Sequence, residues 1–216
     1  MDGTTKDQGE RRQPAATGLG RRDVLQALLT GAGATVAWPA VAGDHPLQQH
    51  AHNPQTVASA DARANRANWQ PAFLTLYQFQ ALSLLSDAIL PGSVASKSPE
   101  FIDALLAVDS EARRRRFMEA FGAMEGLALA QSRKSLKALT ASERQTLLTA
   151  ASTAAPGSAQ TGVEPRPVTS RDHFEHLKGW ISGAHYSSEA GMRELGWTGN
   201  QFFETFAGCT HPDGHA

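Results

Sequence analysis

Residues 75–90, TLYQFQALSLLSDAIL, are the stretch of this 216-residue chain that decides its fold. Thr75 and Gln78 have the spacing of a capping box, in which each side chain bonds the other residue's backbone N–H at a helix start. Behind them, apolar residues recur at three- and four-residue intervals, which is the period of one face of an α-helix. A Pro-Gly pair follows directly and ends the pattern. The stretch predicts an amphipathic helix whose apolar face needs other elements to cover it.

Helical signals continue along the chain, and no stretch shows sustained strand-type alternation. Ser98-Pro99-Glu100 offers an N-cap, a proline at the first helical position and an acid in the first turn. An apolar stripe over 111–129 predicts a long helix. Thr140 and Glu143 form a second capping box, which predicts the start of a shorter helix. The last helical block begins near Thr169. The sequence therefore predicts an all-α fold, a single compact domain of about five or six helices.

An arginine pair near the N-terminus, Arg21-Arg22, is followed directly by a moderately apolar run over 24–41. This order is typical of a twin-arginine export signal, which directs folded proteins across a membrane. The run ends in the small residues Pro39-Ala40-Val41-Ala42, which suit cleavage before Gly43. Two other interpretations stay open, an uncleaved membrane anchor and a general secretion signal. All three place the rest of the chain outside the cytoplasm.

The leader divides the chain into a signal peptide (1–42), a flexible arm (43–70) and a helical domain (71–216). The arm is rich in Ala, Asn, Gln and His and has no apolar period, so we expect it to order only against a partner. It contains three histidines that we expect to be solvated, with copper or zinc capture as the alternative: His45, His50 and His52.

The charge balance argues against one class of function. The chain has a formal net charge of −1 at pH 7, whereas proteins that bind nucleic acid present a basic surface to the phosphates. The four consecutive arginines at 113–116 do not change this, because a helix spreads them around its circumference as solvated or ion-paired positions. We therefore expect no nucleic-acid partner.

The sequence contains no familiar catalytic or cofactor motif. It has no glycine-rich dinucleotide or phosphate loop, no zinc-protease motif and no haem-attachment motif. Cys209 is the single cysteine, so in an oxidising compartment it is either paired with another chain or a free thiol. Cys209, His211 and His215 have a spacing that could hold a soft metal ion, but such sites usually take a fourth ligand. We expect no metal, cofactor or active site in this chain.

An export signal for folded proteins, on a chain without a cofactor motif, points to a partner. Twin-arginine export is normally used when a cofactor or a second subunit must be in place before the membrane is crossed. The leading hypothesis is therefore that the cofactor belongs to a partner that travels with this chain. A stand-alone periplasmic binding or metal-handling protein is the alternative, and an autonomous enzyme is a more remote one.

Three short motifs follow one another near the C-terminus: Tyr186-Ser187-Ser188-Glu189-x-Gly191, Leu195-Gly196-Trp197-x-Gly199 and Phe206-Ala207-Gly208-Cys209-x-His211. Together with the opening stretch 73–92, this order resembles the gluconate 2-dehydrogenase subunit 3 family, and the resemblance covers residues 73–211. The chain departs from the family pattern at Trp197, where tyrosine is the more usual aromatic, and in the long loop over 156–167.

The resemblance implies a non-catalytic small subunit of a periplasmic sugar, polyol or sugar-acid dehydrogenase. In that family the large subunit is a flavoprotein of the glucose–methanol–choline type, so FAD is expected in the partner. A multihaem cytochrome c subunit often passes electrons on, so the complex is expected at the cytoplasmic membrane. The small subunit supplies the signal that the twin-arginine translocase reads, and it helps the large subunit to mature.

The resemblance also implies roles for residues of the C-terminal motifs. Tyr186 and Trp197 would be amphipathic anchors at the partner interface, with core packing as the alternative. Ser188 and Glu189 would cap or orient a turn in which Gly191 permits close backbone approach, and structural capping alone is equally open.

Two further roles concern the ends of the chain. Cys209 would form a disulfide with a cysteine of the large subunit, the alternative being a free or buried thiol. Arg21 and Arg22 would direct the export of both subunits.

Overall fold

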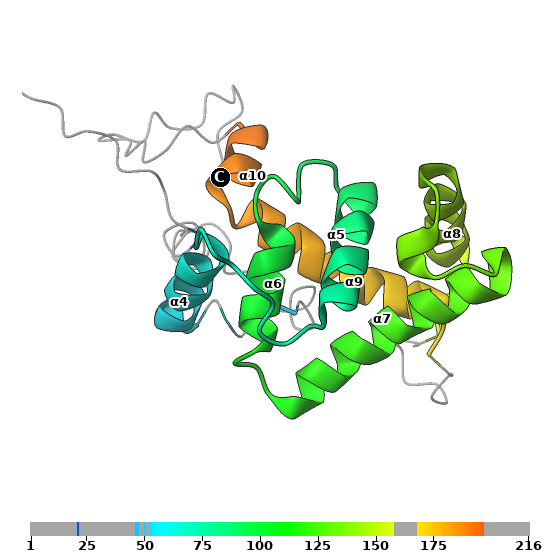
Figure 1. Cartoon of the computed structure of the whole chain (residues 1–216), viewed down its shortest axis with the longest axis horizontal. Helices are drawn as coiled ribbons and strands as arrows, with labels where there is room; N and C mark the ends of the chain where they lie inside the picture. The colour runs from blue at the N-terminus through cyan, green and yellow to red at the C-terminus, as the bar shows by residue number, and fades with distance from the viewer. Residues whose placement is uncertain (1–20, 22–45, 48–49, 51, 158–167, 197–216) are drawn as a thin grey trace, which may run out of the picture.

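The computed structural model describes residue 21, residues 46–47, 50 and 52–157, and residues 168–196. This part of the chain contains seven α-helices, one short 3-10 helix and no strand, which confirms the predicted all-α class. The elements, labelled as in Figure 1, are α4 (Pro54–Ala64), α5 (Leu76–Ile89), α6 (Ser98–Leu106), α7 (Glu111–Ser132), η1 (Leu136–Ala138), α8 (Ala141–Thr153), α9 (Ser170–Tyr186) and α10 (Glu189–Glu194). Six of these α-helices, α5 to α10, lie in the predicted domain 71–216, in agreement with the expected five or six, whereas α4 lies in the stretch expected to be a flexible arm.

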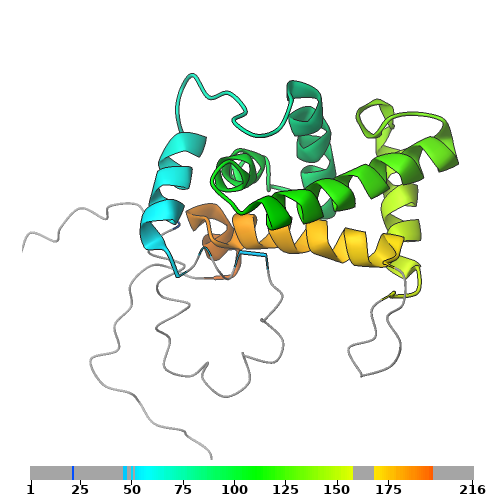
Figure 2. The same cartoon turned by 90° about the horizontal axis from the view of Figure 1, so that it is seen from below.

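α9 is the centre of the arrangement, since it contacts α5, α6, α7, α8 and α10. Its main neighbour is α7, and the two long helices run side by side across the domain (Figure 2). α8 lies at the end where α9 begins, whereas α4 and α10 lie at the end where α9 finishes (Figures 1 and 2). The two ends of α9 therefore have different surroundings.

The core forms where α7 and α9 meet. Phe117 and Trp180 are 0% and 1% exposed, and their rings meet edge to face with centroids 5.8 Å apart. Met124 and Leu177 belong to the same buried cluster. α6 adds to it, since all nine of its residues are buried. Burying each large apolar side chain contributes roughly 1.5–3 kcal/mol, so this contact supplies much of the driving force for folding.

Both predicted capping boxes are present. Thr75 Oγ1 accepts the backbone N–H of Gln78 at 3.3 Å, and Gln78 Oε1 accepts that of Thr75 at 2.9 Å. The corresponding distances for Thr140 and Glu143 are 3.2 Å and 2.8 Å. These contacts satisfy N–H groups that a helix start leaves without partners, and they confirm the predicted starts of α5 and α8.

The start of α6 differs from the prediction. The N-cap position is Lys97, in a left-handed conformation with φ 60°, and its side chain makes no capping bond. Ser98 is instead the first helical residue. Its buried hydroxyl lies 2.8 Å from Ser96 Oγ, so the loop network uses the side chain that the sequence pattern assigned to a cap.

Part of the expected flexible arm is helical, so that expectation is wrong for residues 54–64. Asn53 caps α4 by accepting the backbone N–H of Thr56 at 3.2 Å. Val57 and two alanines bury the inner face of α4, which packs on α6. Alanines add little to a hydrophobic period, and the helix is stabilised mainly by its tertiary contact, as is usual for short helices.

A buried carboxylate fixes the chain just before α5. Asp103 of α6 is 0% exposed, and its oxygens accept the backbone N–H groups of residues 72, 73 and 74 at 2.7, 3.1 and 2.8 Å. Hydrogen bonds to a charged acceptor are stronger than neutral ones. Asp103 therefore positions the capping box of α5 relative to α6.

Candidate functional site

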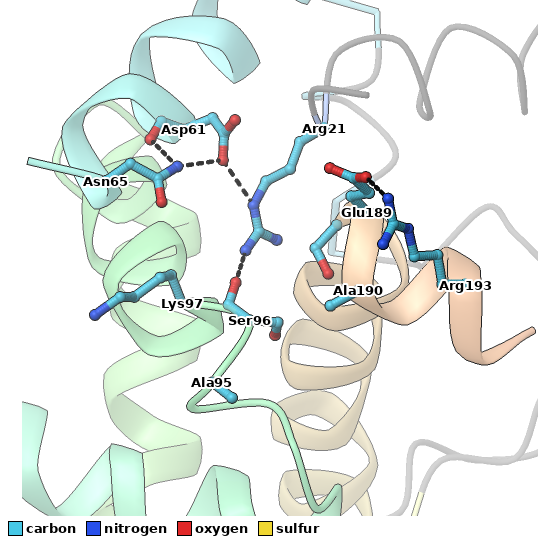
Figure 3. A pocket seen from close by; sticks show the side chains of 10 residues that line it. Arg21, Asp61, Asn65, Ala95, Ser96, Lys97, Glu189, Ala190 and Arg193 are labelled. Atoms are coloured by element: carbon cyan, nitrogen blue, oxygen red, sulfur yellow. Dashed lines mark hydrogen bonds and ion pairs between the residues drawn. The ribbon is translucent and has the colours of Figure 1, made fainter. Parts of the chain in front are cut away.

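The guanidinium of Arg21 lies inside the folded domain (Figure 3), and the side chain is 3% exposed. Its Nε donates to Asp61 Oδ1 of α4 at 2.8 Å. Nη2 donates to the backbone carbonyl of Ser96, in the loop before α6. Nη1 donates to the backbone carbonyl of Ala184 and, at 3.4 Å, to the hydroxyl of Ser187. We call these four acceptor residues the Arg21 cradle.

The surroundings of the cradle favour a positive charge. The guanidinium carbon lies 4.4 Å from the centroid of the Phe101 ring, which is cation–π geometry. Ala184 is in the last turn of α9, where carbonyls lack intrahelical donors and the helix dipole is negative. Burial lowers the pKa of Arg21, while the ion pair with Asp61 and the field of Glu100 oppose that shift. Arginine titrates so far above neutrality that the group stays charged.

The cradle is assembled from parts of the chain that are distant in sequence. Asp61, Ser96 and Ala184 lie 40, 75 and 163 residues from Arg21. They belong to α4, the loop before α6 and the end of α9, so the acceptors come together only in the folded domain. Arg21 lines a cleft of about 400 Å³ with nine other residues: Asp61, Asn65, Ala95, Ser96, Lys97, Ser188, Glu189, Ala190 and Arg193.

A buried histidine joins the cradle to α10. His185 is 2% exposed; its Nδ1 lies 2.9 Å from Ser96 Oγ and its Nε2 lies 2.9 Å from Glu194 Oε2. Ser96 thus contacts Arg21 through its carbonyl and His185 through its hydroxyl. The position of the loop before α6 is therefore tied to the position of α10.

The turn between α9 and α10 has the capping geometry that the sequence suggested. Ser188 Oγ accepts the backbone N–H of Gly191 at 3.1 Å and donates to the carbonyl of His185 at 2.6 Å. A Cβ atom at Gly191 would lie 2.3 Å from that same carbonyl oxygen. Only glycine fits this approach. A partner-interface role for Ser188 and Gly191 stays a prediction.

The structure brings four of the five predicted interface residues together at one end of the domain: Tyr186, Ser188, Glu189 and Gly191. Tyr186 is half-buried, with its ring edge-to-face against His185 at 5.0 Å between centroids. Glu189 forms an ion pair with Arg193 on the next turn of α10 (Figure 3). Trp197, like Arg22 and Cys209, lies outside the described residues.

Three residues of this region were missed by the sequence patterns. Asp61 lies in the stretch that the sequence predicts to be an arm, and Ser96 binds Arg21 through its backbone carbonyl, which no sequence motif reports. His185 directly precedes the Tyr186 motif, and that adjacency is the one signal by which it could have been found.

Two of the three arm histidines, His50 and His52, are among the described residues, and their surroundings differ. His50 is buried rather than solvated, 7% exposed, with Nε2 3.1 Å from Asp109 Oδ2. His52 is exposed, as expected. His45 and the Cys209 tail lie outside the described residues. Among the residues that the structure does describe, no group of three or more histidine, cysteine or acidic side chains could hold a metal ion.

Three of the four consecutive arginines at the start of α7 make local contacts. Arg113 pairs with Asp109 at 2.9 Å and Arg115 with Glu111 at 2.7 Å, in agreement with the predicted ion-paired positions. Arg114 donates to the backbone carbonyl of residue 107 at 3.0 Å.

None of the helices in the described ranges has both the length and the hydropathy needed to span a bilayer.

Comparison with known proteins identifies one family. Residues 77–204 match the sequence profile described as gluconate 2-dehydrogenase subunit 3. The match covers more than half of the chain and nearly all of the segment from α5 to α10. No curated protein and no solved structure matches the chain. The family is the one that the C-terminal motifs suggested, so that prediction is confirmed.

Proposed function

The chain belongs to the gluconate 2-dehydrogenase subunit 3 family, and from this premise we propose that it is the non-catalytic small subunit of a periplasmic FAD-dependent dehydrogenase. Family membership makes it a subunit of a dehydrogenase complex, with a dehydrogenase as its partner. The finer assignment is that the partner oxidises sugars, polyols or sugar acids.

The family match over residues 77–204 is the observation that carries this proposal. It includes α6 to α10 and all of α5 except its first residue. In the proposed complex, a flavoprotein of the glucose–methanol–choline type binds FAD and the substrate. A multihaem cytochrome c subunit takes the electrons towards the cytoplasmic membrane. The chain described here folds with the flavoprotein and provides its export signal.

The export role rests on the leader sequence. Arg21-Arg22 precedes a moderately apolar run over 24–41, the order that a twin-arginine translocase reads. The partner needs no export signal of its own if it crosses the membrane bound to this chain, already folded around its FAD.

The proposed interface with the flavoprotein is the end of the domain formed by α10 and the last turn of α9. Tyr186 and Glu189 lie there, and Leu195 is 62% exposed at the end of α10, which leaves a large apolar side chain available to a partner. Trp197 would extend this surface along the chain, and Cys209 would form the disulfide to the large subunit.

Replacement of the arginine pair tests the export role. The double variant Arg21→Lys with Arg22→Lys keeps both charges, and we expect it to leave most of the dehydrogenase activity in the cytoplasmic fraction. Arg22→Lys alone separates this effect from the contacts of Arg21 inside the domain. The matched control is the same pair of lysine replacements at Arg11-Arg12, a second arginine pair without an apolar run directly behind it. This control should leave export unchanged. Full export of the dehydrogenase by both Arg22 variants would rule out the export role.

Purification of the tagged chain tests the partner. We expect a flavoprotein to co-purify, with the absorbance of bound FAD. On non-reducing electrophoresis the two subunits should migrate together, and separately after reduction or in Cys209→Ser. A colourless, stable monomer would contradict the subunit assignment. Separate migration without reductant, in a complex that still assembles, would contradict only the disulfide.

A further inference from the structure

We propose that the folded domain binds the guanidinium of Arg21 as an internal ligand and so withholds the export signal from the translocase until this contact opens. The inference rests on the proposed function, in that Arg21 is taken as half of a twin-arginine signal. It adds a binding site on the domain and a regulatory step before export.

The first argument is exclusion. Arg21 is 3% exposed, and its Nε, Nη1 and Nη2 atoms all have acceptors within the domain. A side chain enclosed in this way cannot at the same time be bound by another protein. The precursor must therefore exist in a docked state and an open state, and only the open state offers Arg21 to a receptor.

The second argument is specificity for a guanidinium. The cradle presents acceptors to Arg21 from three directions: the carboxylate of Asp61 and the carbonyls of Ser96 and Ala184. A planar fork of five N–H donors can reach all of them, whereas the compact ammonium of lysine cannot. The Phe101 ring completes the site, with the guanidinium carbon over it at 4.4 Å from the ring centroid. The cradle is thus matched to the residue type that defines the signal.

The third argument is that docking depends on the tertiary fold. α4, the loop before α6 and the end of α9 each contribute an acceptor, so an unfolded or partly folded chain has no cradle. His185 ties that loop to α10 through Ser96 and Glu194. Since α10 belongs to the proposed interface, partner binding is the event best placed to open the contact.

Chemical modification of the full-length precursor tests the docked state directly. Phenylglyoxal reacts with accessible guanidinium groups, and mass spectrometry reports the rate for each arginine. Arg115, 64% exposed on α7, is the internal reference. We expect Arg21 to react at least about tenfold more slowly than Arg115, since each hydrogen bond to a charged group adds to the cost of opening. Equal rates in the wild-type chain would overturn the proposal without any variant.

Substitution of the cradle then tests which contacts hold Arg21. Asp61→Ala removes the ion pair while leaving a good helix former in α4, and we expect it to raise the Arg21 rate about tenfold. Glu119→Ala, which removes an exposed carboxylate from α7, is the control and should leave the rate unchanged. Helical circular dichroism verifies that both variants fold. Unchanged protection in folded Asp61→Ala would overturn the assignment of the cradle.

Export assays connect docking to regulation. Without the partner, Asp61→Ala should reach the periplasm faster than the wild-type chain, because its signal is released. Equal export of the two chains, although Arg21 has become reactive in the variant, would overturn the withholding step. The proposed export role fails separately, if Arg22→Lys and the double variant Arg21→Lys with Arg22→Lys both leave export intact.

Discussion

The middle of α9 and its C-terminal end are buried in different ways. In the middle, Trp180 packs against Phe117 of α7 in an apolar contact, which is non-directional and proportional to buried area. At the end, His185 and Ser187 are also buried, but they are held by hydrogen bonds with defined partners. The comparison teaches that apolar packing holds the middle in place, whereas the end depends on individual hydrogen-bond partners.

The largest expected effect is in the apolar middle. Trp180→Ala removes a side chain that is 1% exposed, and truncation of a buried aromatic costs about 3–5 kcal/mol. Chemical denaturation followed by far-UV circular dichroism measures the loss. Val108→Ala, at a residue that is 64% exposed, should change stability by less than about 0.5 kcal/mol. A loss at Trp180 no larger than at Val108 would mean that the α7–α9 contact is not the core.

A smaller loss is expected at the turn that starts α10. Gly191→Ala places a Cβ atom 2.3 Å from the carbonyl oxygen of His185, and relieving such overpacking costs about 1–3 kcal/mol. The matched control is Gly122→Ala on α7, where nothing lies within 4 Å of the added atom. That change should stabilise the chain by about 0.5–1 kcal/mol. Stability changes of opposite sign for the two glycine variants support the comparison. Changes of the same sign contradict the close approach at Gly191.

Loss of the helix cap at Ser188 should lower the free energy of unfolding by less than Gly191→Ala does. Ser188→Ala removes the acceptor for the Gly191 N–H and the donor to the carbonyl of His185, at about 1 kcal/mol. Ser110 caps α7 at an exposed position with a longer bond of 3.4 Å to residue 113, so Ser110→Ala should cost less than Ser188→Ala. Thermal unfolding of the two variants compares a buried cap with an exposed one. If Ser110→Ala lowers stability as much as Ser188→Ala or more, burial does not increase the stability that a helix cap contributes.

The smallest effect concerns Glu143 in the exposed capping box of α8. The hydrogen bond from Lys134 and the backbone N–H of Thr140 lower the pKa of Glu143 to about 2 from its usual 4.5. Its stabilising contribution is therefore complete above the unfolded pKa and is lost as the pH falls through the folded one. In thermal unfolding, the wild-type chain should lose a little stability as the pH falls from 4.5 to about 2. Glu143→Gln should not show this loss, because its side chain does not titrate. The same acid sensitivity in variant and wild type would contradict this contribution.

The sequence predicted those features that local patterns encode. The capping boxes at Thr75 and Thr140 place the starts of α5 and α8 because both partners of each box are three residues apart. The apolar stripe over 111–129 falls within α7. The order of the C-terminal motifs, together with the opening stretch 73–92, indicates the family that the match over 77–204 confirms.

Features that depend on tertiary contacts could not be predicted in this way. α4 is stabilised by packing two small alanines and Val57 against α6, which leaves hardly any trace in hydrophobic periodicity. The Arg21 cradle joins residues as far apart as 21 and 184, and two of its acceptors are backbone carbonyls. The sequence predicts an export role for Arg21, but no local pattern reports the contacts of this residue inside the domain.

The bridge of His185 between Ser96 and Glu194 has a thermodynamic consequence. If attachment of the partner to α10 loosens the hold on Arg21, then the two binding events oppose each other. Such antagonism is reciprocal, because the factor by which one ligand weakens the other is the same in both directions. A precursor with Arg21 docked would then bind its partner more weakly than the chain does once the signal peptide is gone. Cleavage of the leader would thus strengthen the complex after export. The Arg21 cradle, which delays export, would in this way also make assembly harder to reverse.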